Sequence, residues 1–163
     1  PEVIKSIVDI IFNPSLTWEN LKTIKEHTKL PILLKGILHE EDARKALLHG
    51  VDGIIVSNHG GRQLDGCISS LEALPSVAEV IQGNIPVLLD SGIRRGSDVI
   101  KAKALGADVV LLGRPFIYGL ATAGEQGVEH VLRNMINDID VTLALSGCAS
   151  MNEVNSSLIR RKK

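Results

Sequence analysis

Hydrophobic residues gather along this chain in four short runs rich in branched side chains, separated by stretches with helical periodicity. The runs cover residues 31–35, 53–57, 86–90 and 108–113. Their apolar positions are continuous and do not alternate with polar ones, which is typical of strands in a parallel sheet that is covered on both faces. We therefore predict four buried parallel strands.

The segments beside these strands predict the helices of a repeating βα unit. Helical spacing covers 17–27, 40–49, 70–81, 97–105 and 128–145, with a short helix at 115–120. Gly50 and Gly106 follow two of these helices, where a left-handed C-terminal cap favours glycine. Repeats of about 22, 33 and 22 residues suit a (β/α) barrel. We predict an α/β fold with about four βα units, half of a (β/α)8 TIM barrel.

Length and composition place the whole chain, 1–163, in a single partial-barrel domain. The 44% hydrophobic content is enough for one sizeable core and excludes intrinsic disorder. The net charge of -1 excludes an overall basic field, so we expect neither nucleic acid nor a membrane surface as a partner. No apolar stretch approaches the roughly 20 residues that span a bilayer.

The cysteines and the two chain ends add three expectations. Two cysteines are too few for a disulfide scaffold, so we expect a reducing compartment, the cytoplasm. The chain opens at Pro1 directly into an apolar run at 3–12, which suggests a fragment or a processed product. The four cations at 160–163 are expected to be a solvated tail.

Each predicted strand ends in a polar or glycine-rich cluster. The clusters are Lys35-Gly36, Ser57-Asn-His-Gly-Gly-Arg-Gln63, Asp90-Ser-Gly-Ile-Arg94 and Gly113-Arg114-Pro115. Active sites of barrel enzymes lie at the carboxyl ends of the strands and are assembled from several of them. The four clusters together therefore predict one site at this edge of the sheet.

The last two clusters predict a phosphate pocket. Glycine lets backbone N–H groups approach phosphate oxygens, and the arginine fork matches their geometry. Taken singly, Gly92 could be only a turn and Arg114 a solvated charge at a helix start. Their pairing favours phosphate binding by residues at both strand ends: Ser91, Gly92, Arg94, Gly113 and Arg114.

His59 and Arg62 predict chemistry on an acidic substrate. An imidazole can accept a proton near neutral pH, and an arginine nearby can hold a carboxylate through two parallel hydrogen bonds. A purely structural histidine remains the alternative. The other histidines lie on or beside predicted helices, where surface positions are favoured: His27, His39, His49 and His130.

Lys35 ends an apolar strand, where a buried ammonium needs an anionic or carbonyl partner. That partner is either a ligand or a carboxylate of the barrel such as Asp90, and the sequence leaves both open. Asp90 is itself a good acceptor for sugar or polyol hydroxyls. No grouping of His, Cys, Asp and Glu has the spacing of a metal site, and no Walker or dinucleotide GxGxxG motif follows a strand.

These motifs closely resemble the FMN-dependent α-hydroxy acid oxidase family, which includes glycolate oxidase, lactate oxidase and lactate 2-monooxygenase. The resemblance runs from about Asn13 to Ser150 and is most specific in the block 57–63. Asp90-Ser-Gly-Ile-Arg94, where many relatives have glycine in place of Ser91, leans toward the lactate oxidase and lactate 2-monooxygenase branch. The chain resembles the C-terminal half of such a barrel.

The resemblance implies a role for each motif residue. His59 would be the base that takes a proton from a small L-2-hydroxy acid of the lactate or glycolate type as two electrons pass to FMN, and Arg62 would bind the carboxylate. Lys35 would lie beside flavin N1 and O2. Ser57 would contact the flavin, Asp90 the ribityl chain, and the last two clusters the FMN phosphate: Ser91, Gly92, Arg94, Gly113 and Arg114.

The resemblance also implies partners. The electron acceptor would be molecular oxygen or another oxidant, the N-terminal half of the barrel would be supplied separately, and a homo-oligomer is expected. Tyr118, the only tyrosine, is expected to pack in its helix. Two alternatives stay open. The first is a half-barrel, alone or as a dimer that hides its sheet edges, which binds FMN or phosphate without turnover. The second is another phosphate-binding flavoprotein barrel resembling type 2 isopentenyl diphosphate isomerase, which His59 and Arg62 disfavour.

Overall fold

A computed structural model describes residues 15–160, and these residues form two compact units divided between Leu30 and Pro31. The described part of the first unit contains helix α2 (Asn20–His27). Its first turn is closed by the Asn20 side chain, which accepts a hydrogen bond from the Thr17 amide at 2.7 Å. The predicted run at 3–12 and cations 161–163 lie outside the described residues.

The second unit is built on a four-stranded parallel sheet, as the sequence predicts. The strands are β1 (Leu33–Lys35), β2 (Gly53–Val56), β3 (Val87–Leu89) and β4 (Val109–Val110), in the order β1-β2-β3-β4. Registers such as Leu34 opposite Ile54 and Ile55 opposite Leu88 align their carboxyl ends. All four polar clusters therefore meet at one edge of the sheet.

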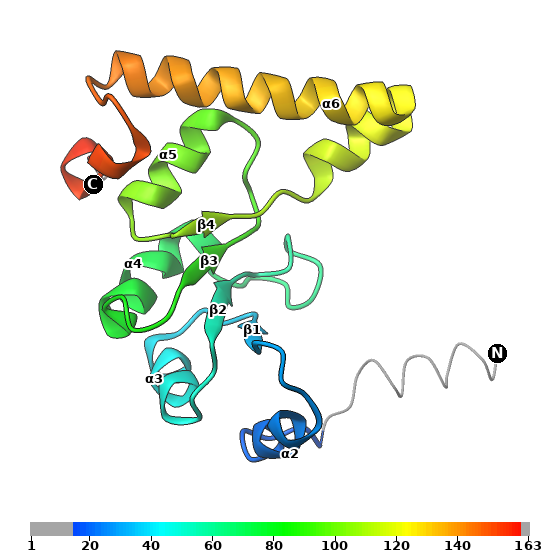
Figure 1. The fold of residues 1–163 in the computed structure, drawn as a ribbon, viewed down its shortest axis with the longest axis vertical. Coiled ribbons are helices and arrows are strands. Elements are labelled where there is room, and N and C mark those ends of the chain that lie inside the picture. Colours follow the sequence, from blue (N-terminus) through cyan, green and yellow to red (C-terminus); the bar gives the residue numbers. More distant parts are fainter. Residues whose placement is uncertain (1–14, 161–163) are drawn as a thin grey trace. The chain divides into compact units, whose positions relative to one another are not determined.

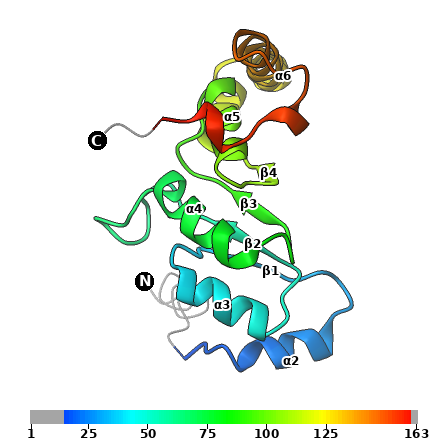
Figure 2. The ribbon, with the colours of Figure 1, turned by 90° about the vertical axis from the view of Figure 1, so that its left-hand side faces the viewer.

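Three helices cover one face of this sheet: α3 (Glu40–Leu48), α4 (Ser70–Ile81) and α5 (Gly96–Ala104). Figures 1 and 2, taken at right angles, both show them on the same side of the strands. The core between sheet and helices is apolar and almost fully buried, with Ile54, Val56 and Leu89 from the strands and Leu74, Val77 and Ile81 from α4. The βα repeat predicted from the sequence is confirmed in its order and in its element positions.

The expectation that every strand is covered on both faces is wrong. Side chains of consecutive strand residues point to opposite faces of the sheet. Val56 and Leu89 are buried, whereas Ile55 and Leu88, which point to the other face, are only half-buried. The edge strands are more open still, with Leu33 39% and Val109 46% exposed. This part of the chain therefore presents one helix-covered face, one partly uncovered face and two unpaired sheet edges.

The two helices predicted at 115–120 and 128–145 are joined in a single element, α6 (Arg114–Leu145), which breaks at Ala123 and Gly124. Figure 1 shows the chain turning back on itself there. Gly119 and Gly127 lie so close across the bend that a Cβ at either would meet the backbone of the other. Two short 3-10 helices, Met151–Glu153 and Ser156–Leu158, follow and were not predicted.

The second half of α6 packs against α5 at its amino end. The Asp138 carboxylate accepts hydrogen bonds from the amides of Gly96 at 2.6 Å and Ser97 at 3.4 Å. These amides have no partner within their own helix, and a carboxylate there also offsets the positive end of the helix dipole. No helix within residues 15–160 is both long and apolar enough to cross a membrane.

Candidate functional site

A cleft of about 940 Å³ lies at the carboxyl edge of the sheet, within the range of small-molecule sites. It is lined by all but one of the residues predicted for the site: Lys35, His59, Arg62, Asp90, Ser91, Gly92, Arg94, Gly113 and Arg114. The exception is Ser57, which is 2% exposed and lies beneath the cleft. The structure thus brings together residues that are up to 79 positions apart, from Lys35 to Arg114.

His59 occupies a tight turn that directly follows β2. The Gly61 amide donates to the Asn58 carbonyl at 3.0 Å, and both residues between them have positive φ, 58° at His59 and 68° at Gly60. Glycine adopts this backbone region freely, and histidine is among the few other residue types enriched in it. The turn therefore exposes the imidazole at the cleft instead of continuing the strand into the core.

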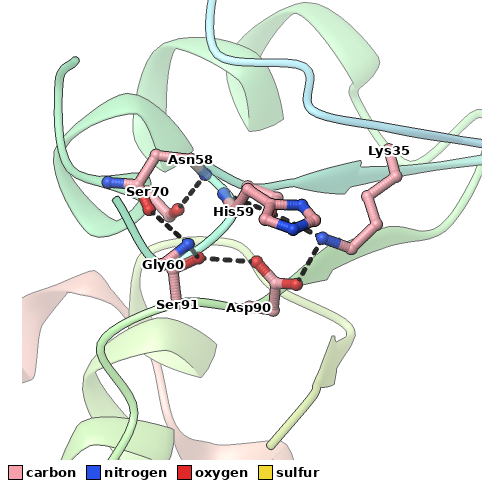
Figure 3. Close-up of polar contacts among 8 residues, drawn as sticks. Lys35, Asn58, His59, Gly60, Ser70, Asp90 and Ser91 are labelled. Atoms are coloured by element: carbon pink, nitrogen blue, oxygen red, sulfur yellow. Dashed lines mark hydrogen bonds and ion pairs between the residues drawn. The ribbon is translucent and has the colours of Figure 1, made fainter. Parts of the chain in front are cut away.

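An ion pair joins the ends of β1 and β3 across the intervening strand. Lys35 Nζ lies 2.7 Å from Asp90 Oδ2 and donates to the Ser57 hydroxyl at 2.9 Å (Figure 3). Burial alone would raise the pKa of the Asp90 carboxyl, but hydrogen bonds from Lys35, Ser57 and Ser91 and the Lys35 charge outweigh it and hold the pKa below its ordinary value. Asp90 is therefore a carboxylate at neutral pH.

Lys35 is less buried than the sequence predicts, and Asp90 is one of its two expected partners. The ammonium was expected to be buried, but 42% of the Lys35 side chain is exposed, against 19% of the Asp90 side chain. The contact with this carboxylate does not replace the other expected partner, a ligand. Since Lys35 also lines the cleft, its remaining donor capacity is accessible to a ligand.

The end of the cleft that is predicted to bind phosphate is formed by the chain after β3 and after β4. Ser91 and Gly92 both have positive φ, 78° and 81°, which turns the chain at the end of β3 into the cleft. Arg94 and Arg114 are exposed along its wall. Together they supply two cations and unhindered backbone to one end of the cleft.

The two helices that start at this end differ in what their first turns already hold. The amino end of α5 is occupied by carboxylates, because Asp98 accepts from the Arg94 and Arg95 amides and Asp138 from those of Gly96 and Ser97. The amino end of α6 has no side-chain cap and no acidic residue in its first turn. An anion in the cleft would therefore be bound by the first turn of α6.

Two further predicted positions are exposed. Arg62 lies in the loop after the His59 turn and lines the cleft. Tyr118 also lines it and is 59% exposed, so the expectation that this tyrosine packs within its helix is wrong.

Residues that support the site were missed because the sequence gives little sign of them. The side-chain oxygen of Asn58 accepts a hydrogen bond from the Gly60 amide at 3.1 Å. The backbone amide of Asn58 donates to the buried Ser70 hydroxyl at 3.0 Å. Asn58 lay within the predicted cluster 57–63, but no role was assigned to it. Asp138, 42 residues from Gly96, had no local pattern to reveal it.

The described residues also leave a smaller hollow away from this edge. It has a volume of about 470 Å³, lies on α3 and α4, and is lined mainly by polar side chains such as Glu40, Arg44 and Glu79. None of the residues predicted for the site lines it. Within residues 15–160, no group of three or more His, Cys, Asp and Glu side chains could hold a metal ion.

Comparison with known proteins gives a family match over residues 2–161, to the model described as FMN-dependent dehydrogenase. The chain is 57% identical to an L-lactate oxidase of Lysinibacillus sphaericus over 148 residues, 91% of this chain and 38% of that protein. It is 52% identical to a peroxisomal (S)-2-hydroxyacid oxidase of Arabidopsis thaliana, covering 91% of this chain and 41% of the relative.

Solved structures give the same picture. A mandelate oxidase with benzoyl-formic acid matches with a TM-score of 0.82 and 46% identity, over 86% of this chain and 42% of that one. The chain thus spans well under half the length of these relatives, and the fold of its described part is close to the corresponding part of the oxidase.

Replacing Asp90 with Asn should change how stability depends on pH. The pKa of Asp90 is depressed by folding, so its contribution is fully present above the ordinary value of 3.8 and is lost as the pH falls through the lower folded value. Urea unfolding from about pH 6 to about pH 2.5 measures the gap in unfolding free energy between the unsubstituted chain and Asp90→Asn. This gap should close as the pH falls below 3.8.

Asp98→Asn is the matched control, because the amides of Arg94 and Arg95, together with Lys101, outweigh burial and depress the pKa of Asp98 as well. Its difference in unfolding free energy should vanish in the same acid range, although Asp98 pairs with Lys101 and not with Lys35. A gap for Asp90→Asn that is constant over the whole pH range would contradict the assigned ion pair.

Proposed function

Because this chain belongs to the FMN-dependent dehydrogenase family, we propose that it carries the catalytic base and the phosphate-binding end of an FMN-dependent oxidase of small L-2-hydroxy acids, of the lactate or glycolate type. The observation that carries the proposal is the single cleft lined by His59, Arg62, Lys35 and both predicted phosphate clusters. Curated relatives named L-lactate oxidase and 2-hydroxyacid oxidase support the substrate class.

The donor set of the cleft fits a flavin mononucleotide. The uncapped first turn of α6, the backbone at Gly92 and Gly113, and the cations Arg94 and Arg114 would hold a phosphate. Asp90 would accept from ribityl hydroxyls. Ser57 is buried under the cleft and bonded to Lys35, so we propose that it acts on the flavin through Lys35.

When bound, FMN supplies a two-electron acceptor. The chain contributes Lys35, whose ammonium is held by Asp90 and Ser57 yet exposed to the cleft. A fixed cation can stabilise negative charge that develops in the cleft without reorganising. Asp90 keeps this ammonium in place, and its own charge is already compensated by the pair.

His59 and Arg62 act on the substrate. The Arg62 guanidinium would hold the carboxylate of a 2-hydroxy acid through two parallel hydrogen bonds. His59 would then accept the proton of the substrate hydroxyl, and the turn at 58–61 fixes where the imidazole enters the cleft. The Cα hydrogen of the substrate and two electrons would pass to FMN when it is bound, leaving the 2-oxo acid, and oxygen or another acceptor would take these electrons in turn.

The whole activity requires more than this chain. Within residues 15–160 the sheet has two unpaired edges, and Ile55 and Leu88 on the face away from the helices are only half-buried. Unpaired parallel edges are unusual in soluble proteins. We propose that an N-terminal half supplies four more βα units, which would close a (β/α)8 barrel on β1 and β4, and that the completed protein forms a homo-oligomer.

We propose a cytoplasmic location on the free thiols Cys67 and Cys148 alone. The name of the Arabidopsis relative gives that protein a peroxisomal one. Fractionation of cells that produce the protein distinguishes the two compartments.

The function is tested by the visible absorption spectrum of the purified chain with FMN, before and after anaerobic L-lactate, with every copurifying polypeptide identified by mass spectrometry. Bleaching of the flavin band is the expected result when the other half is present. A perturbed but unbleached flavin in such a preparation would support the alternative, a half-barrel that binds FMN without turnover.

His59→Ala should slow flavin reduction by roughly 10²–10⁴-fold, because a general base contributes about that much. FMN should remain bound, since His59 is not among the proposed phosphate ligands. Stopped-flow absorbance measures the rate and fluorescence quenching measures binding. His130→Ala, an exposed histidine on α6, is the control and should behave as the unsubstituted protein. Loss of flavin from His59→Ala would refute the division of roles.

Arg62→Lys should raise the apparent KM for L-lactate by about tenfold, because one ammonium cannot reproduce the bidentate contact with a carboxylate. FMN affinity should not change. Steady-state kinetics over a range of lactate concentrations measure the effect. An unchanged apparent affinity for lactate would remove Arg62 from the substrate site.

Arg114→Gln should weaken FMN binding by about tenfold or more, the loss expected for one charge-assisted contact with phosphate. Riboflavin, which has the same ring and ribityl chain without the phosphate, should bind equally to both forms. Arg44→Gln, which removes an exposed arginine from α3, serves as the control. Equal weakening of FMN and riboflavin would show that Arg114 supports the cleft and does not contact the phosphate.

A further inference from the structure

Gly60 is held both at its amide and at its carbonyl. Its amide donates to the Ser91 hydroxyl at 2.9 Å and to the Asn58 side chain at 3.1 Å. Its carbonyl accepts from Arg114 Nη2. Asn58 belongs to the same turn, whereas Ser91 and Arg114 come from the chain after β3 and from the start of α6. The peptide next to His59 is therefore fixed by the proposed phosphate end.

Ser91 connects this peptide to the ion pair. Its hydroxyl donates to Asp90 Oδ1 at 2.8 Å while accepting from Gly60. Figure 3 shows these contacts as a continuous path from the His59 turn to Lys35.

The path returns to the turn on the other side. The Ser57 hydroxyl, which accepts from Lys35, also accepts from the His59 amide at 3.0 Å. The His59 amide therefore donates to the Ser57 hydroxyl, and the Gly60 amide donates to the Ser91 hydroxyl. These two hydroxyls are connected through the Lys35–Asp90 pair. The backbone of His59 closes these contacts into a ring.

The backbone of Ser91 gives independent reason to look for a role of its hydroxyl. Its φ is 78°, in the left-handed region that glycine adopts without strain and serine does not. Ser91 lines the cleft and is only half-buried. Its side chain makes two hydrogen bonds, to Asp90 and Gly60, which glycine could not make.

We propose that Ser91 is a positioning residue for His59: its hydroxyl closes the ring and fixes the Gly60 peptide, and through it the direction in which the imidazole enters the cleft. The catalytic part of this inference rests on the proposed function, because a fixed orientation of the imidazole affects turnover only if His59 is the base. The positioning itself concerns the described chain alone and is measurable without flavin or substrate.

The experiment compares Ser91→Gly and Ser91→Ala with the unsubstituted 163-residue chain. Both variants lack the hydroxyl, but only alanine keeps the strain of a side chain at positive φ. Amide hydrogen exchange followed by NMR should show the Gly60 amide exchanging about fivefold or more faster in both variants, the effect of losing one hydrogen bond. The Ile54 amide, which donates within the sheet to Pro86 at 3.1 Å, should keep its rate.

Ser76→Ala is the matched control, because Ser76 makes one hydrogen bond within α4, to the Ala73 carbonyl at 3.0 Å. It should leave the Gly60 amide unchanged. Gly60 exchange in Ser91→Gly equal to that of the unsubstituted chain would overturn the inference, since the hydroxyl would then be dispensable. A parallel rise at Gly60 and Ile54 would also overturn it, because it would reveal only a general loss of stability.

In a preparation that reduces flavin with L-lactate, Ser91→Gly should lower kcat about tenfold and leave the KM for lactate unchanged, since Arg62 and not Ser91 would bind the carboxylate. A change in KM alone would contradict positioning of the base. Absence of flavin reduction in the unsubstituted preparation would count against the proposed function, while the exchange rates of Gly60 would still decide whether Ser91 fixes the turn.

Discussion

The ion pair between Lys35 and Asp90 is the interaction on which the site depends. It joins the carboxyl ends of β1 and β3 at 2.7 Å, although the two strands are separated by β2. A parallel sheet makes this possible, because its strands end at a common edge. The hydroxyls of Ser57 and Ser91 connect the ion pair to the backbone of the His59 turn through hydrogen bonds. One charged contact thereby sets both the cation and the histidine of the proposed active site.

The positions of the carboxylates at this edge of the sheet separate the proposed phosphate-binding end of the cleft from the proposed substrate-binding end. Asp98 and Asp138 occupy the first turn of α5, so the positive end of that helix is already compensated. The first turn of α6 carries no such cap, and Arg94 and Arg114 lie exposed near it. An anionic group therefore meets attraction at one end of the cleft, while the other end presents His59 and Arg62 to a second anion, the substrate carboxylate.

Much of this arrangement was predictable from the sequence. Continuous apolar runs gave the strands, and the polar cluster after each run gave the site, because the carboxyl ends of parallel strands converge. The predictions that were wrong concern the exposure of individual side chains. Lys35 is more exposed than its strand suggested, Tyr118 lines the cleft instead of packing, and the edge strands lack cover on one face. These properties depend on contacts between distant residues, as with Asp138 and α5, and on surfaces that the proposed N-terminal half would cover.

The four strand ends of this chain form the proposed FMN site, and the most direct test is a map of where FMN binds. Amide shifts in ¹H–¹⁵N spectra should be followed as FMN is added to the isotopically labelled chain. The predicted result is that the largest shifts fall on Gly92, Gly113 and Arg114, at the phosphate end of the cleft. Shifts concentrated at Glu40, Arg44 and Gln82, around the hollow on α3 and α4, would contradict the account, as would a spectrum that FMN leaves unchanged.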